Sequence, residues 1–170
     1  MWRSRRGWNI KMEFAIYTDG GCIGNKRDSG CPGAYAYIIL DESGSEIINN
    51  SGLRENVTNN QMELLAVIAG SKKLMDYTNK FHGISKKHSV IIYTDSKYVC
   101  DNFSDYLQDW KKNGWKKSNR SPVVNVEYWK KLDHLSSEFQ SFRIRWVKGH
   151  ASNEFNVRAD AMVQKRLSKR

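Results

Sequence analysis

The chain has 170 residues, of which 39% are hydrophobic and 27% are charged. This length and balance predict a single globular domain with a sizeable core, and no apolar run is long enough to span a membrane. Basic residues outnumber acidic ones by 28 to 18, which leaves a net charge of +10. Such an excess indicates a polyanionic partner, and the lack of a basic amphipathic helix favours nucleic acid over a membrane surface.

The N-terminal residues and the cysteines indicate the compartment in which the protein resides. Residues 1–11 are basic without an apolar secretory core, so we expect a flexible basic extension over 1–11, a single domain over 12–170 and a cytoplasmic protein; a very short organelle-targeting segment is the alternative for the N-terminus. Cys22, Cys31 and Cys100 lack zinc-site spacing and indicate free thiols in a reducing compartment. A Cys22–Cys31 bridge is the alternative.

The predicted elements form one α/β layer. Strands are expected over 14–19, 34–40, 46–53, 90–95 and 142–146, with a hairpin turn over 41–44. Helices are expected over 58–75 and 96–108, from 125, and from about 155, with a loop or frayed helix end over 77–89. This order predicts a five-stranded mixed sheet, its first three strands antiparallel, flanked by helices.

Two of the strands end in the same three residues, Tyr-Thr-Asp. The first places Asp19 before two glycines, and the fourth places Asp95 before Ser96. Asp after a strand is often only a turn former or a helix cap, which is the alternative for each stretch alone. If the two strands are neighbours, however, both carboxylates lie side by side at one edge of the sheet.

The helix over 58–75 begins with a capping box, in which Thr58 is the N-cap and Gln61 completes the pair. Its first three turns are almost entirely apolar, so the helix should be buried, yet it carries Glu63. A buried carboxylate is costly unless it is paired or bound to a metal. Either a Lys or Arg partner or a metal ion is therefore expected at Glu63.

Four carboxylates from separate elements thus stand out: Asp19, Glu63, Asp95 and Asp160 on the last helix. If clustered, they would repel one another and raise each other's pKa values. Divalent cations relieve this repulsion, and ligands made only of oxygen favour Mg²⁺ or Mn²⁺ over zinc. Two such ions about 3.5–4 Å apart suit an in-line displacement at phosphorus.

On these residues the chain closely resembles the type 1 ribonuclease H family in its bacterial form. The resemblance runs from residue 12 nearly to the C-terminus, and its strength lies in the joint order and spacing of the motifs. The matching segments are Thr18-Asp19-Gly20, Cys22–Asn25, Thr58-Asn59-Asn60 through Glu63-Leu64, Thr94-Asp95-Ser96, Trp110–Trp115, Trp146-Val147-Lys148-Gly149-His150, and the pair Asn156 and Asp160.

The resemblance implies an endoribonuclease that hydrolyses the RNA strand of RNA–DNA hybrids by a two-metal-ion mechanism, leaving 5′-phosphate and 3′-hydroxyl ends. It implies two Mg²⁺ ions per site, with Mn²⁺ as a substitute, and a monomer without an obligate protein partner. Asp19, Glu63, Asp95 and Asp160 would be the ligands, and Glu63 would also contact the RNA 2′-OH. His150 would assist proton transfer or product departure, whereas alone it would be read as a surface histidine.

Further roles follow from the same resemblance. Thr58 and Asn59 would hold a DNA phosphate at a helix N-terminus, and Gly20, Ser96 and Asn156 would support the site. The other expected substrate contacts are Asn25, Asn60 and Gln61 in the minor groove, Tyr106, Trp110 and Asn125 along the DNA strand, and Lys111, Lys112, Trp115, Lys116 and Lys117 in a basic protrusion, whose alternative is a solvated loop.

Three departures from the family pattern and two other functions remain. The loop after Asn25 has Lys26–Cys31 inserted, Tyr106 replaces a common Trp, and residues 1–11 are too short for a separate hybrid-binding domain. A nuclease domain derived from a reverse transcriptase would share the motifs, but the full protrusion counts against it. A catalytically silent hybrid-binding module would not need all four carboxylates.

Overall fold

The sheet contains the five strands that the sequence predicts. The computed structural model describes residues 10–24, 30–149 and 152–169. The strands are β1 (Glu13–Cys22), β2 (Cys31–Leu40), β3 (Glu46–Val57), β4 (Ser89–Thr94) and β5 (Ser141–Trp146), in the spatial order β3-β2-β1-β4-β5. The pairs β1–β2 and β2–β3 are antiparallel, whereas β4 runs parallel to both β1 and β5. The prediction of a five-stranded mixed sheet with three antiparallel strands first is therefore confirmed.

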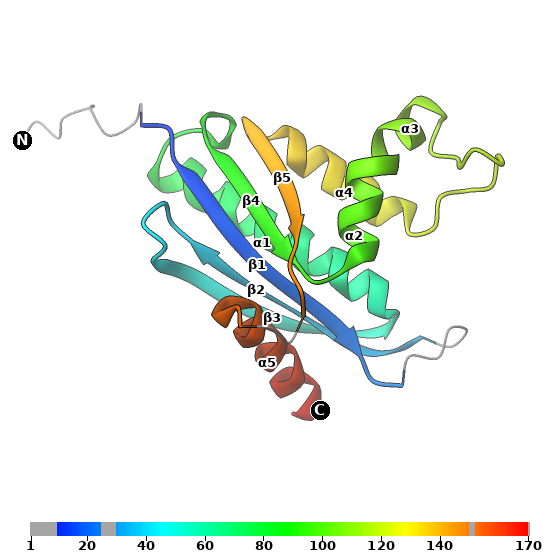
Figure 1. Cartoon of the computed structure of the whole chain (residues 1–170), viewed down its shortest axis with the longest axis horizontal. Helices are drawn as coiled ribbons and strands as arrows, with labels where there is room; N and C mark the ends of the chain where they lie inside the picture. Colours follow the sequence, from blue (N-terminus) through cyan, green and yellow to red (C-terminus); the bar gives the residue numbers. More distant parts are fainter. Residues whose placement is uncertain (1–9, 25–29, 150–151, 170) are drawn as a thin grey trace, which may run out of the picture.

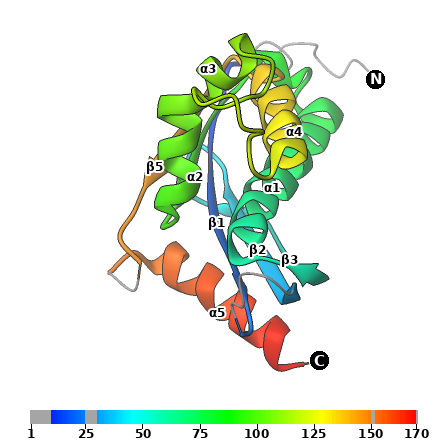
Figure 2. The same ribbon diagram turned by 90° about the vertical axis from the view of Figure 1, so that its right-hand side faces the viewer.

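Helices cover both faces of this sheet (Figures 1 and 2). The helices α1 (Asn59–Phe81) and α4 (Val126–Ser137) lie on one face, and α5 (Glu154–Ser168) lies on the other. Strand β1 serves both layers because its side chains alternate: Ile16 joins the cluster that contains Leu64 of α1, and Tyr17 packs in the cluster that contains Ala159 of α5. None of the described helices has the length and apolar character that a membrane crossing requires.

Helix α1 is longer than its apolar pattern predicts. The expected capping box is present, with the Thr58 hydroxyl and the Gln61 side chain each accepting from the other residue's backbone N–H. The helix continues to Phe81, so the loop or frayed end predicted from 77 is wrong for its first turn. The reason is tertiary: Tyr77 packs edge-on against Phe14 of β1, with ring centroids 6.4 Å apart, and Thr78 is fully buried. A single 3₁₀ turn, Ser85–Lys87, then leads into β4.

The helical stretch after β4 also runs further than expected. It consists of α2 (Lys97–Asp101), a π-helical turn (Asn102–Tyr106) and α3 (Leu107–Lys112), so it passes the predicted end at 108. Ser96 caps it as predicted, its hydroxyl accepting from the Val99 N–H at 3.2 Å. The stretch continues because Trp110 is buried against Trp129 of α4, with ring centroids 5.5 Å apart.

Strands β2 and β3 extend beyond their predicted bounds toward the inserted loop. Cys31 pairs with Val57 beside a bulge, so β2 begins at Cys31, the last residue of the predicted insertion. The thiols of Cys22 and Cys31 both face the Val57 carbonyl, at 3.6 and 3.3 Å. Cys22, Cys31 and Cys100 are all free thiols, so the alternative bridge is not formed.

The chain joins the fold just ahead of β1. The Met12 backbone N–H donates to His88 Nδ1 at 3.2 Å, and the Ser89 N–H donates to the Met12 carbonyl at 3.0 Å. Residues 1–9 lie outside the described part of the chain, so a flexible extension over 1–11 and a single domain over 12–170 stay predictions.

Candidate active site

Two of the predicted carboxylates meet where β4 ends. The parallel pairing of β1 with β4 stops at Thr18 opposite Thr94, and the next residue on each chain segment is Asp19 or Asp95. The expectation that these two lie side by side is confirmed. Asp19 is not at the end of its own strand, however, because β1 continues along β2 as far as Cys22.

Helix α1 brings a third carboxylate to the same place. A Cβ at Gly20 would lie only 2.3 Å from the Met62 carbonyl carbon, so only glycine lets β1 approach α1 this closely. Glu63, the next residue along the helix, is 6% exposed and points to the end of the β1–β4 pair. Oxygens of Asp19, Glu63 and Asp95 all lie within 4.8 Å of one another.

The fourth carboxylate arrives from the opposite face of the sheet. Helix α5 begins after Asn153, whose side chain accepts from the Asn156 N–H at 3.0 Å. Asp160 lies four residues beyond the buried Asn156, and its carboxyl is close enough to Asp19 to raise the pKa of that residue. All four predicted ligands therefore converge, and they come from both helical layers and from the sheet between them.

The cluster is electrostatically strained in the absence of a cation. Burial, with Asp95 and Asp160 as further causes, raises the pKa of Asp19 from its ordinary 3.8 to about 8. Burial also raises the pKa of Glu63 well above its usual range, with Asp19 as the next cause. The Gly20 backbone N–H offsets both shifts only in part. Without a counter-charge, Asp19 retains its proton at neutral pH.

These residues fit a divalent metal. One oxygen of Glu63, Oε2, is buried and has no hydrogen-bond partner within the described residues. No Lys or Arg among them forms an ion pair with Glu63 either, so the alternative of a basic partner is not borne out. An all-carboxylate donor set suits the hard cations Mg²⁺ and Mn²⁺. The cap at the start of α2 is Ser96, so Asp95 is not needed as a helix cap.

Two predicted substrate contacts are joined beside the cluster. Gln61 at the start of α1 donates from Nε2 to Asn125 Oδ1 at 3.2 Å, and Asn125 Nδ2 donates to the Tyr98 hydroxyl at 3.0 Å. Asn125 precedes α4 as expected, but its side chain makes no cap hydrogen bond because these two contacts use it. Its backbone is left-handed, with φ at 59°. Thr58 and Asn59 are partly exposed at the same helix end, and Asn60 is exposed.

The predicted basic protrusion is an ordered hairpin-like loop between α3 and α4. Lys117 N–H donates to the Ser121 carbonyl at 2.9 Å, and Lys116 bridges to Pro122. Lys112, Lys116 and Lys117 are exposed. Lys111 differs from them, because its ammonium forms a 3.0 Å ion pair with Asp133 of α4.

The aromatic residues of this region divide by exposure. Tyr106 is 53% exposed and stacks on Trp110, with ring centroids 6.2 Å apart. Trp110 is only 8% exposed, so Tyr106 presents most of the aromatic surface to a ligand. Trp115 is partly buried beneath the ammonium of Lys130, 5.8 Å from its ring centroid.

Comparison with known proteins assigns the family. The RNase H profile matches residues 11–168. A protein named Ribonuclease H from Wolbachia sp. subsp. Drosophila simulans (strain wRi) is 40% identical over 157 residues, which are 92% of this chain and 97% of the relative. This chain belongs to the ribonuclease H family. Family members hydrolyse phosphodiester bonds with the help of metal ions, so the chain is a nuclease.

Solved structures agree with this fold. LC9-RNase H1, described as a type 1 RNase H with the type 2 active-site motif, has a TM-score of 0.77 at 24% identity, over 94% of this chain and 74% of that chain. LC11-RNase H1, solved in complex with an RNA/DNA hybrid, has a TM-score of 0.68 at 23% identity, over 92% of this chain and 97% of its own. The ribonuclease H-like fold predicted from the motifs is confirmed.

Two residues of this ribonuclease H site escaped the sequence analysis as site residues. Trp146, at the end of β5, donates from Nε1 to the Asp95 carbonyl at 3.0 Å, and the Lys97 ammonium lies 4.9 Å from its ring centroid. A Cβ at Gly149 would lie 2.7 Å from Asp95 Oδ2, so glycine is required there. Both belong to the motif around Lys148, but no local pattern shows that they touch Asp95.

Two predicted residues lie outside the described part of the chain, Asn25 and His150. The roles that the family resemblance implies for them stay predictions.

Proposed function

We propose that this protein hydrolyses the RNA strand of RNA–DNA hybrids without sequence preference, leaving 5′-phosphate and 3′-hydroxyl ends. The observation that carries the proposal is the convergence of Asp19, Glu63 and Asp95 within 4.8 Å, with Asp160 close enough to Asp19 to raise its pKa. Membership of the ribonuclease H family and the hybrid bound to the LC11 relative support the choice of substrate.

Asp19, Glu63, Asp95 and Asp160 would hold two divalent cations, Mg²⁺ or in its place Mn²⁺. Bound at this site, the cations supply charge neutralisation and a more acidic water. The chain's own contribution would be to hold four carboxylates together, of which Asp19 and Glu63 are buried and Asp95 and Asp160 are partly exposed. Glu63, the most buried of them with Asp19, would also contact the RNA 2′-OH beside the cleavage site.

His150 would assist proton transfer or product departure, and Asn156 would orient His150 or the attacking water. Asn156 is 2% exposed and sits one helical turn before Asp160, which supports a positioning role. Replacing His150 by Ala should lower turnover more than substrate binding. A change in KM alone would contradict the role proposed for His150.

The helix N-terminus and the protrusion would bind the hybrid on either side of the cleavage site. Thr58 and Asn59 would hold a phosphate of the DNA strand, since a helix N-terminus favours anions. Asn25, Asn60 and Gln61 would contact the minor groove, where 2′-hydroxyls distinguish RNA. The DNA strand would follow Asn125, Tyr106 and Trp110 toward the protrusion, where Lys111, Lys112, Trp115, Lys116 and Lys117 are the proposed contacts.

The two other functions are less well supported. A silent hybrid-binding module does not explain why, among the described residues, a buried Glu63 oxygen has no hydrogen-bond partner beside two further carboxylates. A domain derived from a reverse transcriptase does not explain the match along 97% of a relative named Ribonuclease H. We further propose that the protein acts as a cytoplasmic monomer.

The test is digestion of sequence-matched RNA–DNA, RNA–RNA and DNA–DNA duplexes, each with and without Mg²⁺. We expect cleavage only of the RNA–DNA duplex and only with Mg²⁺, and phosphatase treatment should change the mobility of the 5′-phosphorylated fragments. Cleavage of RNA–RNA or DNA–DNA duplexes at a comparable rate would contradict the proposed specificity. Binding of the hybrid without cleavage, at any Mg²⁺ or Mn²⁺ concentration, would instead favour the silent module.

A further inference from the structure

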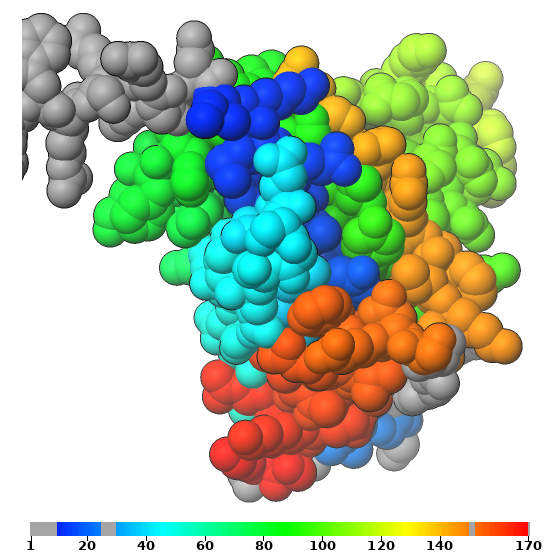
Figure 3. All heavy atoms as spheres, turned by 60° about the vertical axis from the view of Figure 1, so that its left-hand side comes forward, coloured from blue at the N-terminus to red at the C-terminus, as the bar shows by residue number. Residues whose placement is uncertain are grey.

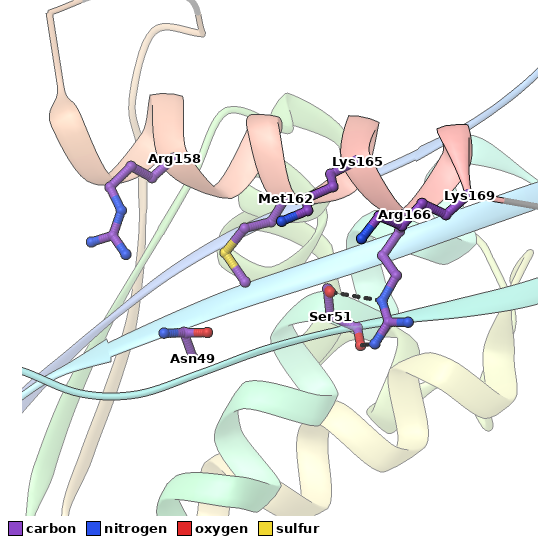
Figure 4. Close-up of a pocket in the computed structure, with 7 residues that line it drawn as sticks. All are labelled: Asn49, Ser51, Arg158, Met162, Lys165, Arg166 and Lys169. Atoms are coloured by element: carbon purple, nitrogen blue, oxygen red, sulfur yellow. Dashed lines mark hydrogen bonds between the residues drawn. The ribbon is translucent and has the colours of Figure 1, made fainter.

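A second charged feature lies away from the carboxylate cluster, between α5 and the edge strand β3. Here the two elements enclose a hollow of about 450 Å³, lined by Lys165 and Arg166 of α5, by Lys169 directly after it, and by Asn49 and Ser51 of β3 (Figure 4). In the space-filling view, α5 lies beside the β2–β3 segments on an open face of the molecule (Figure 3). We refer to this feature as the α5–β3 hollow.

The hollow carries uncompensated positive charge. Arg158 at its edge is neutralised, because both of its terminal nitrogens contact the Glu46 carboxylate. Lys165, Arg166 and Lys169 are exposed, and no carboxylate of the described residues forms an ion pair with any of them. Three cations therefore face one concave surface without an acidic partner.

One of these cations is held in place. Arg166 donates from Nε to the Ser51 hydroxyl at 2.9 Å and from Nη2 to the Ser51 carbonyl at 3.0 Å. These two bonds orient the planar guanidinium without neutralising its charge, as the dashed lines in Figure 4 show. An oriented guanidinium loses less conformational entropy when it binds an anion, and its fork of donors suits phosphate oxygens.

The lining favours a phosphate backbone over a protein partner. Met162 is the one apolar side chain among the lining residues, and no aromatic ring lines the hollow, so the anchors that dominate protein interfaces are missing. Lys169 caps the C-terminus of α5 four residues after Lys165, so the two lie about one helical turn apart, about 6 Å along the axis. Phosphates of one nucleic-acid strand follow one another at about 3.4 Å along a duplex axis, so two of them can be reached together.

The hollow is separate from the carboxylate cluster although the same helix serves both. At 3.6 residues per turn, Arg166 lies about 240° around α5 from Asp160. Asp160 contacts Asp19, whereas Arg166 contacts the edge strand β3. We propose that the α5–β3 hollow is a second, non-catalytic site that binds the phosphate backbone of nucleic acid outside the cleft. Without aromatic rings, it binds without base preference.

The test measures binding of a nucleic acid that the proposed activity does not cleave. Fluorescein-labelled 20-nucleotide oligothymidine is titrated with the full chain, without Mg²⁺, over a series of salt concentrations, and anisotropy is recorded. Replacing Lys165 and Lys169 by Ala should weaken binding about three- to tenfold and reduce the salt slope by about 1.4, since each single-strand phosphate contact contributes about 0.7. Adding Arg166→Ala should deepen both changes.

Two controls separate this site from general electrostatics and from catalysis. Lys72→Ala with Lys73→Ala removes the same charge from the exposed face of α1 and should leave binding almost unchanged. A ten-base-pair RNA–DNA hybrid should be hydrolysed by the Lys165/Lys169 variant at the wild-type rate. Circular dichroism and the melting temperature will show whether each variant is folded. The double variant of Lys165 and Lys169 retains both residues of the Arg166–Ser51 hydrogen bonds.

Four results would overturn the proposal. They are unchanged oligothymidine binding in both variants of the hollow, an equal loss in the Lys72/Lys73 control, a parallel loss of short-hybrid hydrolysis, and competition by polyglutamate as effective as that by unlabelled oligothymidine. The last result would assign the hollow to an acidic protein segment. Oligothymidine binding needs no cleavage, so the result of this binding experiment does not depend on whether the proposed nuclease activity is found.

Discussion

The carboxylate cluster and the basic protrusion are built in opposite ways. Asp19, Glu63, Asp95 and Asp160 come from β1, α1, the end of β4 and α5, and burial changes the ionisation of Asp19 and Glu63. The protrusion lysines come from one continuous stretch and stay in water. The difference shows that metal chemistry needs convergence and desolvation, whereas attraction of a polyanion needs only a local run of charge.

Removing one proposed metal ligand from the carboxylate cluster should abolish most of the catalytic activity and spare hybrid binding. Asp19→Asn should lower kcat for hybrid cleavage by about 10³-fold, because it removes a charge that holds the catalytic cations. Hybrid binding should survive, since the basic and polar contacts remain. Steady-state kinetics and a gel-shift assay measure the two effects. The exposed Asp76→Asn is the matched control, and substantial activity of Asp19→Asn with Mg²⁺ would contradict the metal assignment.

The stability of the metal-free protein should depend on pH through the carboxylate cluster. The folded-state pKa of Asp19, about 8, lies above its ordinary 3.8, so between these values the native protein holds a proton that the unfolded chain has lost. The free energy of unfolding of the metal-free protein should therefore fall as pH rises from about 4 to 8. Each kcal/mol lost lowers the melting temperature by about 2–4 °C for a chain of this size.

Two measurements check this dependence by calorimetry. Asp19→Asn should flatten the pH profile of the metal-free protein, because the amide cannot ionise. Mg²⁺ should raise the melting temperature of the wild-type protein more at pH 8 than at pH 5, because it binds the ionised carboxylates. A Mg²⁺ effect that is equal at both pH values would show that the cluster is not the binding site.

On the basic side, the lysines should affect substrate binding and spare the chemistry. Replacing Lys112, Lys116 and Lys117 by Ala should raise KM about tenfold at low salt and reduce the salt slope by about 2–3, with little change in kcat. The structure separates Lys111 from this group, because Lys111→Ala also breaks the ion pair with Asp133. An unchanged KM in the triple variant would leave the protrusion as a solvated loop.

The smallest expected effect tests the support of Asp95. Trp146→Phe removes the indole N–H that donates to the Asp95 carbonyl and keeps most of the ring. A single hydrogen bond is worth about 0.5–1.5 kcal/mol, so we expect kcat to fall about two- to tenfold with KM nearly unchanged. Trp115→Phe, in the protrusion, is the control and should leave kcat unchanged. A change in KM alone would indicate that Trp146 binds substrate and does not position Asp95.

The local features of the fold could be predicted from the sequence. Apolar runs ending in Thr-Asp, the capping box of Thr58 and Gln61, and the lone Glu63 in an apolar helix are all encoded within one element, where periodicity and capping chemistry decide the structure. The five-stranded sheet and the family resemblance followed from their order. The same reasoning failed at element ends, since the extension of α1 to Phe81 depends on Tyr77 packing against Phe14 of β1.

The contacts between elements could not be predicted from the sequence and are seen only in the tertiary structure. The approach that Gly20 permits between β1 and α1, the pairing of Lys111 with Asp133 and the use of Asn125 by Gln61 and Tyr98 join residues far apart in the chain. The α5–β3 hollow is of the same kind. The spacing of its basic residues on α5 is readable as one helical face, but the strand that orients Arg166 lies 115 residues earlier, and no local pattern can specify that distance.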